Sequence, residues 1–180
     1  MKSKIIAISA ISAGLAAICL TVGIYVEMAD MFALIMASSF VILPLYYKSY
    51  KGCVLAVLAG GVIAMIFGGF NFLSLVIPSF FFFFGFYPVL ASFLREKQIK
   101  KPLYFLIGIA WCVIYFYGAY FYYIGIMGMS FSDFPDWLSW INDNILYFLG
   151  AFGIIFYFIY DRFITVVRLL EDKFLSKIIK

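Results

Sequence analysis

Eight residues combine the chemical types that a small-molecule binding site needs, and they lie in or beside polar connections between long apolar runs. They are Glu27, Asp30, Asn71, Tyr120, Tyr123, Trp137, Trp140 and Asn144. Carboxylate and amide groups can orient a ligand by hydrogen bonds, while Tyr and Trp rings supply apolar walls. We predict an outward-facing pocket from these residues, with the stretch 133–137 as its lid. The alternative is an aromatic belt at the membrane–water interface.

Residue combinations for catalysis are missing from the sequence. The chain has no His, which removes His-dependent general base catalysis and most metal sites. No glycine-rich phosphate loop precedes a Lys-Ser/Thr pair, and no apolar run holds two carboxylates near its centre. Cys19, Cys53 and Cys112 stand singly within apolar runs, without the spacing of a metal or redox motif. We therefore expect no enzyme activity, no metal site and no cofactor.

The overall composition is that of a membrane protein. Of the 180 residues, 67% are apolar and 12% are charged. A soluble domain has about 45–50% apolar and about 25% charged residues. Apolar runs of roughly 20 residues, the length that crosses the hydrocarbon core of a bilayer, recur along the chain. One integral membrane domain therefore occupies residues 1–180.

Charge clusters and turn signals divide this domain into six spans. The predicted spans are 5–26, 31–47, 52–68, 72–94, 102–124 and 145–165, and a cytoplasmic tail follows over 166–180. The turn before the fourth span is placed at residues 68–71, where two glycines and an Asn form a loop signal. A cleaved signal peptide is the alternative for the first span, but its apolar run exceeds the usual stretch of about 7–15 residues.

The charged residues set the orientation of these spans. If the connections alternate across the membrane, all 13 Lys and Arg residues fall on one side. The other side carries only acids, namely Glu27, Asp30, Asp133, Asp136 and Asp143. The positive-inside rule then places both chain ends in the cytoplasm. The predicted fold class is an all-α membrane protein, a six-transmembrane-helix bundle with the N-in/C-in arrangement. This distribution accounts for the net charge of +4 without a nucleic-acid partner.

Two stripes of small residues suit close helix packing, which holds helices together in lipid. The third span has Gly or Ala at every fourth position from Gly52 to Gly68, including Gly60. The first span carries a second stripe of small side chains, which includes Ala10, Ala13, Gly14 and Ala17. Packing within the bundle and contact with a separate membrane protein are both open for each stripe. A bulky side chain at Gly60 is expected to damage the bundle.

Asp161 and Arg162 are adjacent near the cytoplasmic end of the sixth span, whereas the span centres carry no charge. The first interpretation is an interfacial pair, with Arg162 extended toward the headgroups. The second is a docking point for a cytoplasmic partner.

Two short stretches resemble a known transporter family. They are Phe84-Gly85-Phe86-Tyr87-Pro88-Val89 in the fourth span and Phe158-Ile159-Tyr160-Asp161 before the basic tail. Together with the chain length, six spans and a small-residue first helix, they resemble the substrate-binding S components of energy-coupling factor vitamin transporters. They also resemble a group of small membrane proteins from Gram-positive bacteria related to these S components.

The resemblance implies a helical bundle in a bacterial plasma membrane that captures a micronutrient from outside. Two cytoplasmic ATPases would supply energy through a transmembrane coupling subunit. In that family, small residues spaced by four on the first helix meet the coupling subunit. Ala13 and Ala17 match that spacing here, with Ala10 and Gly14 beside them. No residue pattern points to a particular vitamin.

Two other function classes stay open beside the transporter subunit. One is a non-transporting membrane scaffold or assembly protein, in which the aromatic residues are only lipid anchors. The other is a small channel or gradient-driven carrier, which the absence of charge at the span centres opposes.

Overall fold

The protein is an all-α bundle in the computed structural model, which describes residues 2–70, 74–128 and 144–178. Within these ranges, all regular structure is helical. Six helical segments are long and apolar enough to cross a membrane: Ser3–Tyr25, Asp30–Tyr47, Tyr50–Phe67, Val76–Glu96, Lys101–Gly125 and Ile145–Lys177. The predicted six-helix class is confirmed, and the chain is a multi-pass membrane protein.

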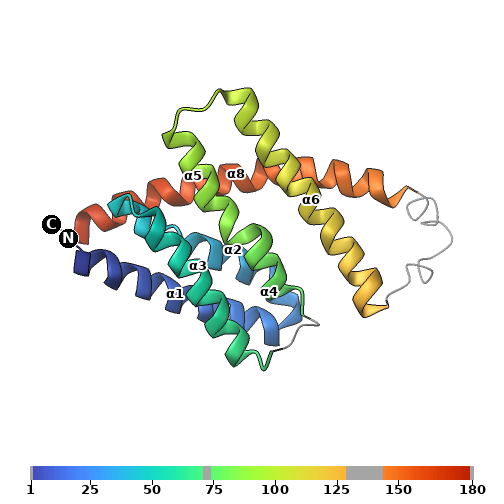
Figure 1. Cartoon of the computed structure of the whole chain (residues 1–180), viewed down its shortest axis with the longest axis horizontal. Helices are drawn as coiled ribbons and strands as arrows, with labels where there is room; N and C mark the ends of the chain where they lie inside the picture. Colours follow the sequence, from blue (N-terminus) through green and yellow to red (C-terminus); the bar gives the residue numbers. More distant parts are fainter. Residues whose placement is uncertain (1, 71–73, 129–143, 179–180) are drawn as a thin grey trace.

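The first three helices form one compact half of the molecule (Figure 1). Helix α1 covers Lys2–Tyr25, α2 covers Asp30–Phe40 and α3 covers Tyr50–Phe67. The α-helical part of the second span ends early, and a 3₁₀ turn, η2 (Leu43–Tyr47), continues the chain with Pro44 in its first turn. Proline lacks a backbone donor and disfavours a regular α-helix around it, so the helical geometry changes here.

Helix α3 packs closely on α1 through its predicted stripe of small residues. Gly52, Ala56, Gly60 and Ala64 are all buried. At Gly60, an added Cβ would lie 3.1 Å from the carbonyl oxygen of Ala13 and 3.2 Å from the Cβ of Ala16. The missing side chain therefore allows the two backbones to approach each other.

The fourth span changes its helical geometry in the middle. It consists of α4 (Val76–Ser79), the π-helical turn η3 (Phe80–Phe84) and α5 (Phe86–Glu96). Prolines at positions 78 and 88 bracket this turn, and each removes a donor that a regular helix would use. A side chain from a neighbouring helix bonds to one carbonyl of the turn: the indole N–H of Trp111 donates to the carbonyl oxygen of Phe82 at 3.0 Å.

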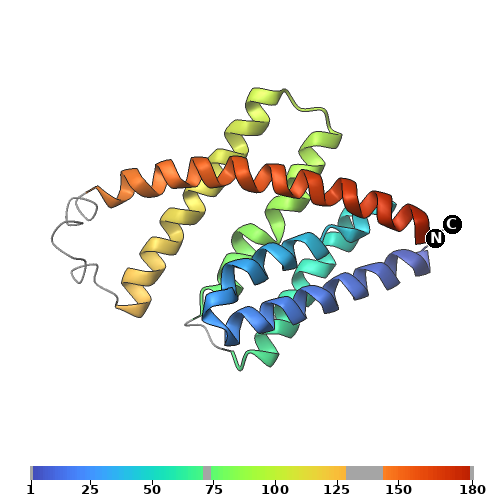
Figure 2. The same cartoon turned by 180° about the vertical axis from the view of Figure 1, so that it is seen from behind.

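The last two helices cross each other (Figures 1 and 2). They are α6 (Lys101–Met127) and α8 (Ile145–Ile178). Helix α8 has 34 residues, so residues 166–178 of the predicted tail directly continue the sixth span. Figures 1 and 2 show α8 running along most of the molecule and ending close to the start of α1.

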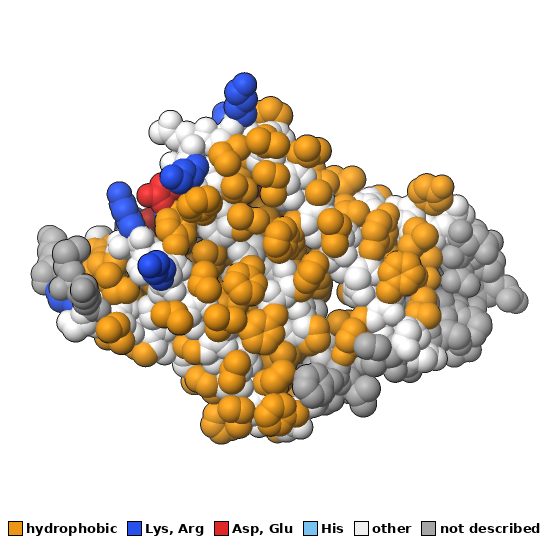
Figure 3. Space-filling view, viewed as in Figure 1, with side chains coloured by type: hydrophobic (Ala, Val, Ile, Leu, Met, Phe, Trp, Pro, Cys, Tyr) orange, Lys and Arg blue, Asp and Glu red, His pale blue; other side chains and the backbone are white. Residues whose placement is uncertain are grey.

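The surface agrees with a membrane location. Exposed large hydrophobic side chains occur on every spanning helix, for example Ile18, Leu55, Leu106 and Ile159. Figure 3 shows that hydrophobic side chains cover most of one face, while the visible Lys and Arg side chains gather at one end. That end corresponds to the predicted cytoplasmic side.

Candidate functional site

Three of the eight predicted site residues line one cavity. Asp30, Tyr120 and Tyr123 border a hollow of about 250 Å³ near the start of α2, the end of α6 and the start of α8 (Ile145–Ile178), which is the predicted outer side. Asp30 begins α2, and both tyrosines lie near the end of α6. The remaining walls come from α2, α4, α6 and the beginning of α8. The fold thus brings together residues from connections that are far apart in the sequence.

Two polar residues of this cavity were not predicted from the sequence. The hydroxyl of Tyr115 donates a hydrogen bond to the Oγ of Ser79 at 2.9 Å, and both side chains are buried. They lie inside predicted spans, whereas the prediction considered connections and span ends. Helical spacing could have identified Tyr115, because it lies on the same face of α6 as residues 119, 122 and 123.

Asp30 combines a structural and a chemical role in the cavity. Its carboxylate accepts a hydrogen bond from the backbone N–H of Met31 in the first turn of α2. The helix dipole stabilises a negative charge at this position, so Asp30 favours the start of α2 here. The half-buried carboxylate faces a cavity whose other walls are mainly apolar. It can receive a cationic or hydrogen-bond-donating group.

A second hollow of about 210 Å³ adjoins the first and shares Ser79 and Tyr115 with it. Its remaining lining includes Pro78, Phe82 and Gly118. A Cβ added at Gly118 would meet nothing within 4 Å, which shows how open this part of α6 is. The Ser79–Tyr115 hydrogen bond therefore lies where the two hollows meet.

The other five predicted residues are not placed in this cavity. Asn144 is exposed, and its carbonyl accepts hydrogen bonds from the backbone N–H groups of Tyr147 and Phe148 at the start of α8. Glu27 is the first residue of the 3₁₀ turn η1 (Glu27–Ala29), and its side chain lies outside the described part of the structure. Asn71, Trp137, Trp140 and the predicted lid lie outside the described residues.

A partly buried ion pair lies toward the opposite end of the bundle. The Nη2 of Arg95 donates to the Oδ1 of Asp161 at 2.6 Å. The hydroxyl of Tyr87 donates to the same oxygen at 2.9 Å, and Tyr104 donates to it as well. The expected pair between Asp161 and Arg162 is wrong. Successive helix side chains diverge by about 100°, so Asp161 faces α5 and α6 while Arg162 is exposed.

Stacked aromatic rings connect the outer cavity with this ion pair. The ring of Tyr115 stacks on Phe83 with centroids 5.0 Å apart, and Phe83 stacks on Tyr87 at 5.2 Å. Tyr87 then donates its hydrogen bond to Asp161. Parallel offset rings add about 0.5–1.5 kcal/mol per pair beyond the area that they bury. This part of the run of five phenylalanines is therefore a specific packing element.

The predicted docking residues on α1 face two directions. Ala13 and Ala17 are buried within the bundle, on the side of α1 that packs against α3. Ala10 is exposed, and a Cβ added at Gly14 would meet nothing within 4 Å. Only Ala10 and Gly14 therefore remain accessible to another membrane protein.

Fold and surface together define an all-α, multi-pass membrane protein. The chain matches no model of a known protein family, no curated protein and no solved structure. The described residues contain no group of His, Cys, Asp and Glu that could hold a metal ion.

Proposed function

We propose that this protein is a membrane-embedded binding subunit that captures a small molecule from outside the cell. The observation that supports it best is the cavity that joins Asp30, Tyr120 and Tyr123 with the buried Ser79–Tyr115 pair. An apolar hollow with a few converging polar groups is the usual architecture of a small-molecule site.

The chemistry of the cavity suggests its ligand class. One carboxylate among aromatic rings favours a flat ligand with a cationic or N–H and O–H donor group. The two adjoining hollows have volumes of about 250 and 210 Å³, which suits a compact molecule of micronutrient size. This agrees with the expected role as the substrate-binding subunit of an energy-coupling-factor-type importer in a bacterial plasma membrane.

Separate ATPase subunits would power such an importer through a transmembrane coupling subunit. The accessible small residues Ala10 and Gly14 support a close helix contact on α1. Replacing both with Leu is expected to abolish co-purification of a coupling subunit, whereas replacing Ala13 or Ala17 would disturb α1–α3 packing itself.

A thermal-shift screen of the detergent-purified protein against water-soluble vitamins and their precursors tests the proposed binding role. A true ligand is expected to raise the thermal midpoint, and Asp30→Asn is expected to weaken its binding about tenfold or more, as for the loss of one charged hydrogen bond. Mass spectrometry of the purified protein provides an independent search for a bound ligand.

Asp172→Asn is the matched control, because Asp172 is an exposed acid near the far end of α8. It should leave ligand binding unchanged. The proposal is contradicted if no compound binds, or if the Asp30 and Asp172 variants bind a ligand equally well. An empty protein that self-associates would instead support the scaffold alternative.

A further inference from the structure

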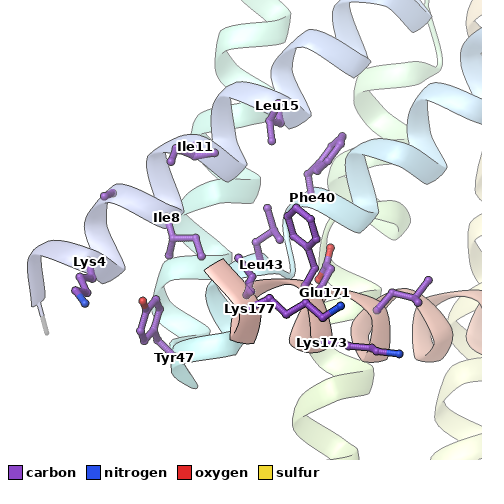
Figure 4. A pocket seen from close by; sticks show the side chains of 14 residues that line it. Lys4, Ile8, Ile11, Leu15, Phe40, Leu43, Tyr47, Glu171, Lys173 and Lys177 are labelled. Carbon is purple, nitrogen blue, oxygen red and sulfur yellow. The ribbon is translucent and has the colours of Figure 1, made fainter. Parts of the chain in front are cut away.

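A wide groove lies at the opposite end of the molecule from the proposed substrate cavity. It has a volume of about 1040 Å³ and lies between the first half of α1, the second span and the last turns of α8. Ile8, Ile11 and Leu15 of α1 form one wall, and Phe40 and Leu43 continue it (Figure 4). Most of the groove surface is therefore hydrocarbon.

Three lysines and one glutamate border this apolar surface. Lys4 comes from the start of α1, while Lys173, Lys177 and Glu171 come from the end of α8 (Figure 4). Among residues 2–70, 74–128 and 144–178, the one ion pair within 4.0 Å is Arg95–Asp161. No carboxylate thus neutralises the groove lysines at contact distance, and the groove has a net positive charge.

This combination has the amphipathic character of one class of ligand. The acyl chains of a lipid can lie along the apolar wall, while the ammonium groups of the lysines attract its phosphate. Basic pockets between membrane helices on the cytoplasmic side bind anionic headgroups, because that leaflet carries the negatively charged lipids. The predicted orientation places the groove on that side.

We propose that the groove is a binding site for one anionic phospholipid. Lys4, Lys173 and Lys177 attract the headgroup phosphate, and the acyl chains lie against the apolar wall. The carboxyl group of Glu171 forms a hydrogen bond with a headgroup hydroxyl, as in phosphatidylglycerol. The lipid joins the first and last helices, because its contacts come from both. The groove shares no lining residue with the proposed substrate cavity.

Native mass spectrometry of the full-length protein with equal amounts of dioleoyl phosphatidylglycerol and dioleoyl phosphatidylcholine tests the proposal. We expect the wild-type protein to retain phosphatidylglycerol preferentially, with one molecule per chain. Each lysine near a lipid headgroup contributes about a fivefold preference. The triple variant Lys4→Gln, Lys173→Gln, Lys177→Gln should therefore lose most of the selectivity.

A matched triple variant separates this site from general charge attraction. Lys97, Lys100 and Lys101 belong to the same predicted cytoplasmic side, are exposed and do not line the groove. Their replacement with Gln should keep the preference for phosphatidylglycerol. A second variant, Ala7→Trp, fills the groove without changing its charge and should also release the lipid.

Three results would overturn the proposal. The first is equal retention of the two lipids by the wild-type protein. The second is an equal loss of selectivity in both triple variants, which would indicate diffuse charge attraction. The third is unchanged lipid retention in Ala7→Trp. If this variant instead dissociated a dimer without altering lipid selectivity, a second copy of the chain would be the occupant.

Discussion

At the residue scale, Asp161 is the residue whose surroundings most distinguish this bundle. Asp161 is only 7% exposed to solvent, and its carboxylate accepts hydrogen bonds from three side chains on two other helices. An ionised group in a membrane-embedded interior is stable only when it is paired and hydrogen-bonded. Arg95 and Tyr104 are also held together by a cation–π contact, with the guanidinium 5.2 Å from the ring centroid.

The contribution of this network can be measured with two tyrosines. Tyr87→Phe removes a hydrogen bond to a charged acceptor and is expected to lower stability by about 1.5–3 kcal/mol. Tyr157→Phe is the matched control, because the Tyr157 hydroxyl is buried with no partner among the described residues. Its removal should leave stability unchanged or raise it. Thermal unfolding in detergent measures both, and equal losses would contradict the assignment.

The sequence could not predict the partners of Asp161, although it located the residue at the inner end of the sixth span. Arg95 is 66 positions away from Asp161, and Tyr87 is 74 positions away. The adjacent Arg162 was the predicted partner, but the helix rotation of about 100° per residue directs its side chain away from Asp161. For the same reason, the cavity was predicted through Asp30 and Tyr123 while Ser79 and Tyr115 were missed, since their contact depends on how two spans pack.

At the element scale, close packing of α1 on α3 depends on the small-residue stripe. Gly60→Leu is expected to lower stability by about 1–3 kcal/mol, the usual cost of overpacking, because the backbone of α1 lies directly opposite. Gly14→Leu adds the same side chain on α1, where a Cβ meets nothing within 4 Å. It should leave the thermal midpoint of the isolated protein unchanged. A similar loss in both variants would contradict the packing role.

The spans were predictable because their signals are local. Apolar runs, charge clusters and the glycines at 68 and 69 each act over a few residues, so most predicted span ends fall close to helix ends. The α3 stripe was visible for the same reason, as a repeat of four. The π-helical turn η3 and the length of α8 were not, because they depend on how neighbouring helices satisfy backbone groups and cover apolar surface.

At the scale of the whole molecule, the arrangement of charge predicts the orientation in the membrane. Met28, which is fully exposed between α1 and α2, belongs to the predicted outer side. Lys100 lies between α5 and α6 on the predicted inner side. Moving the cationic connections across the membrane would oppose the positive-inside rule. The two positions should therefore be reachable from opposite compartments.

Cysteine accessibility measures this orientation directly. In a variant with the three native cysteines replaced by Ala, Met28→Cys should react with a membrane-impermeant thiol reagent on intact cells. Lys100→Cys should react only after the cells are permeabilised. Reaction of both cysteines from the same compartment would show that the chain is threaded differently. The positions proposed for the cavity and the lipid groove would then need to be exchanged or abandoned.

The continuity of α8 has a mechanical consequence. Its 34 residues extend for about 51 Å at 1.5 Å per residue, well beyond the roughly 30 Å of hydrocarbon. Leu149 near its first turn borders the proposed substrate cavity, and Glu171 near its last turns borders the proposed lipid groove. No proline interrupts the helix between them. One continuous helix therefore joins the two proposed sites, and we expect a change in the tilt of α8 at one site to move the side chain that it contributes to the other.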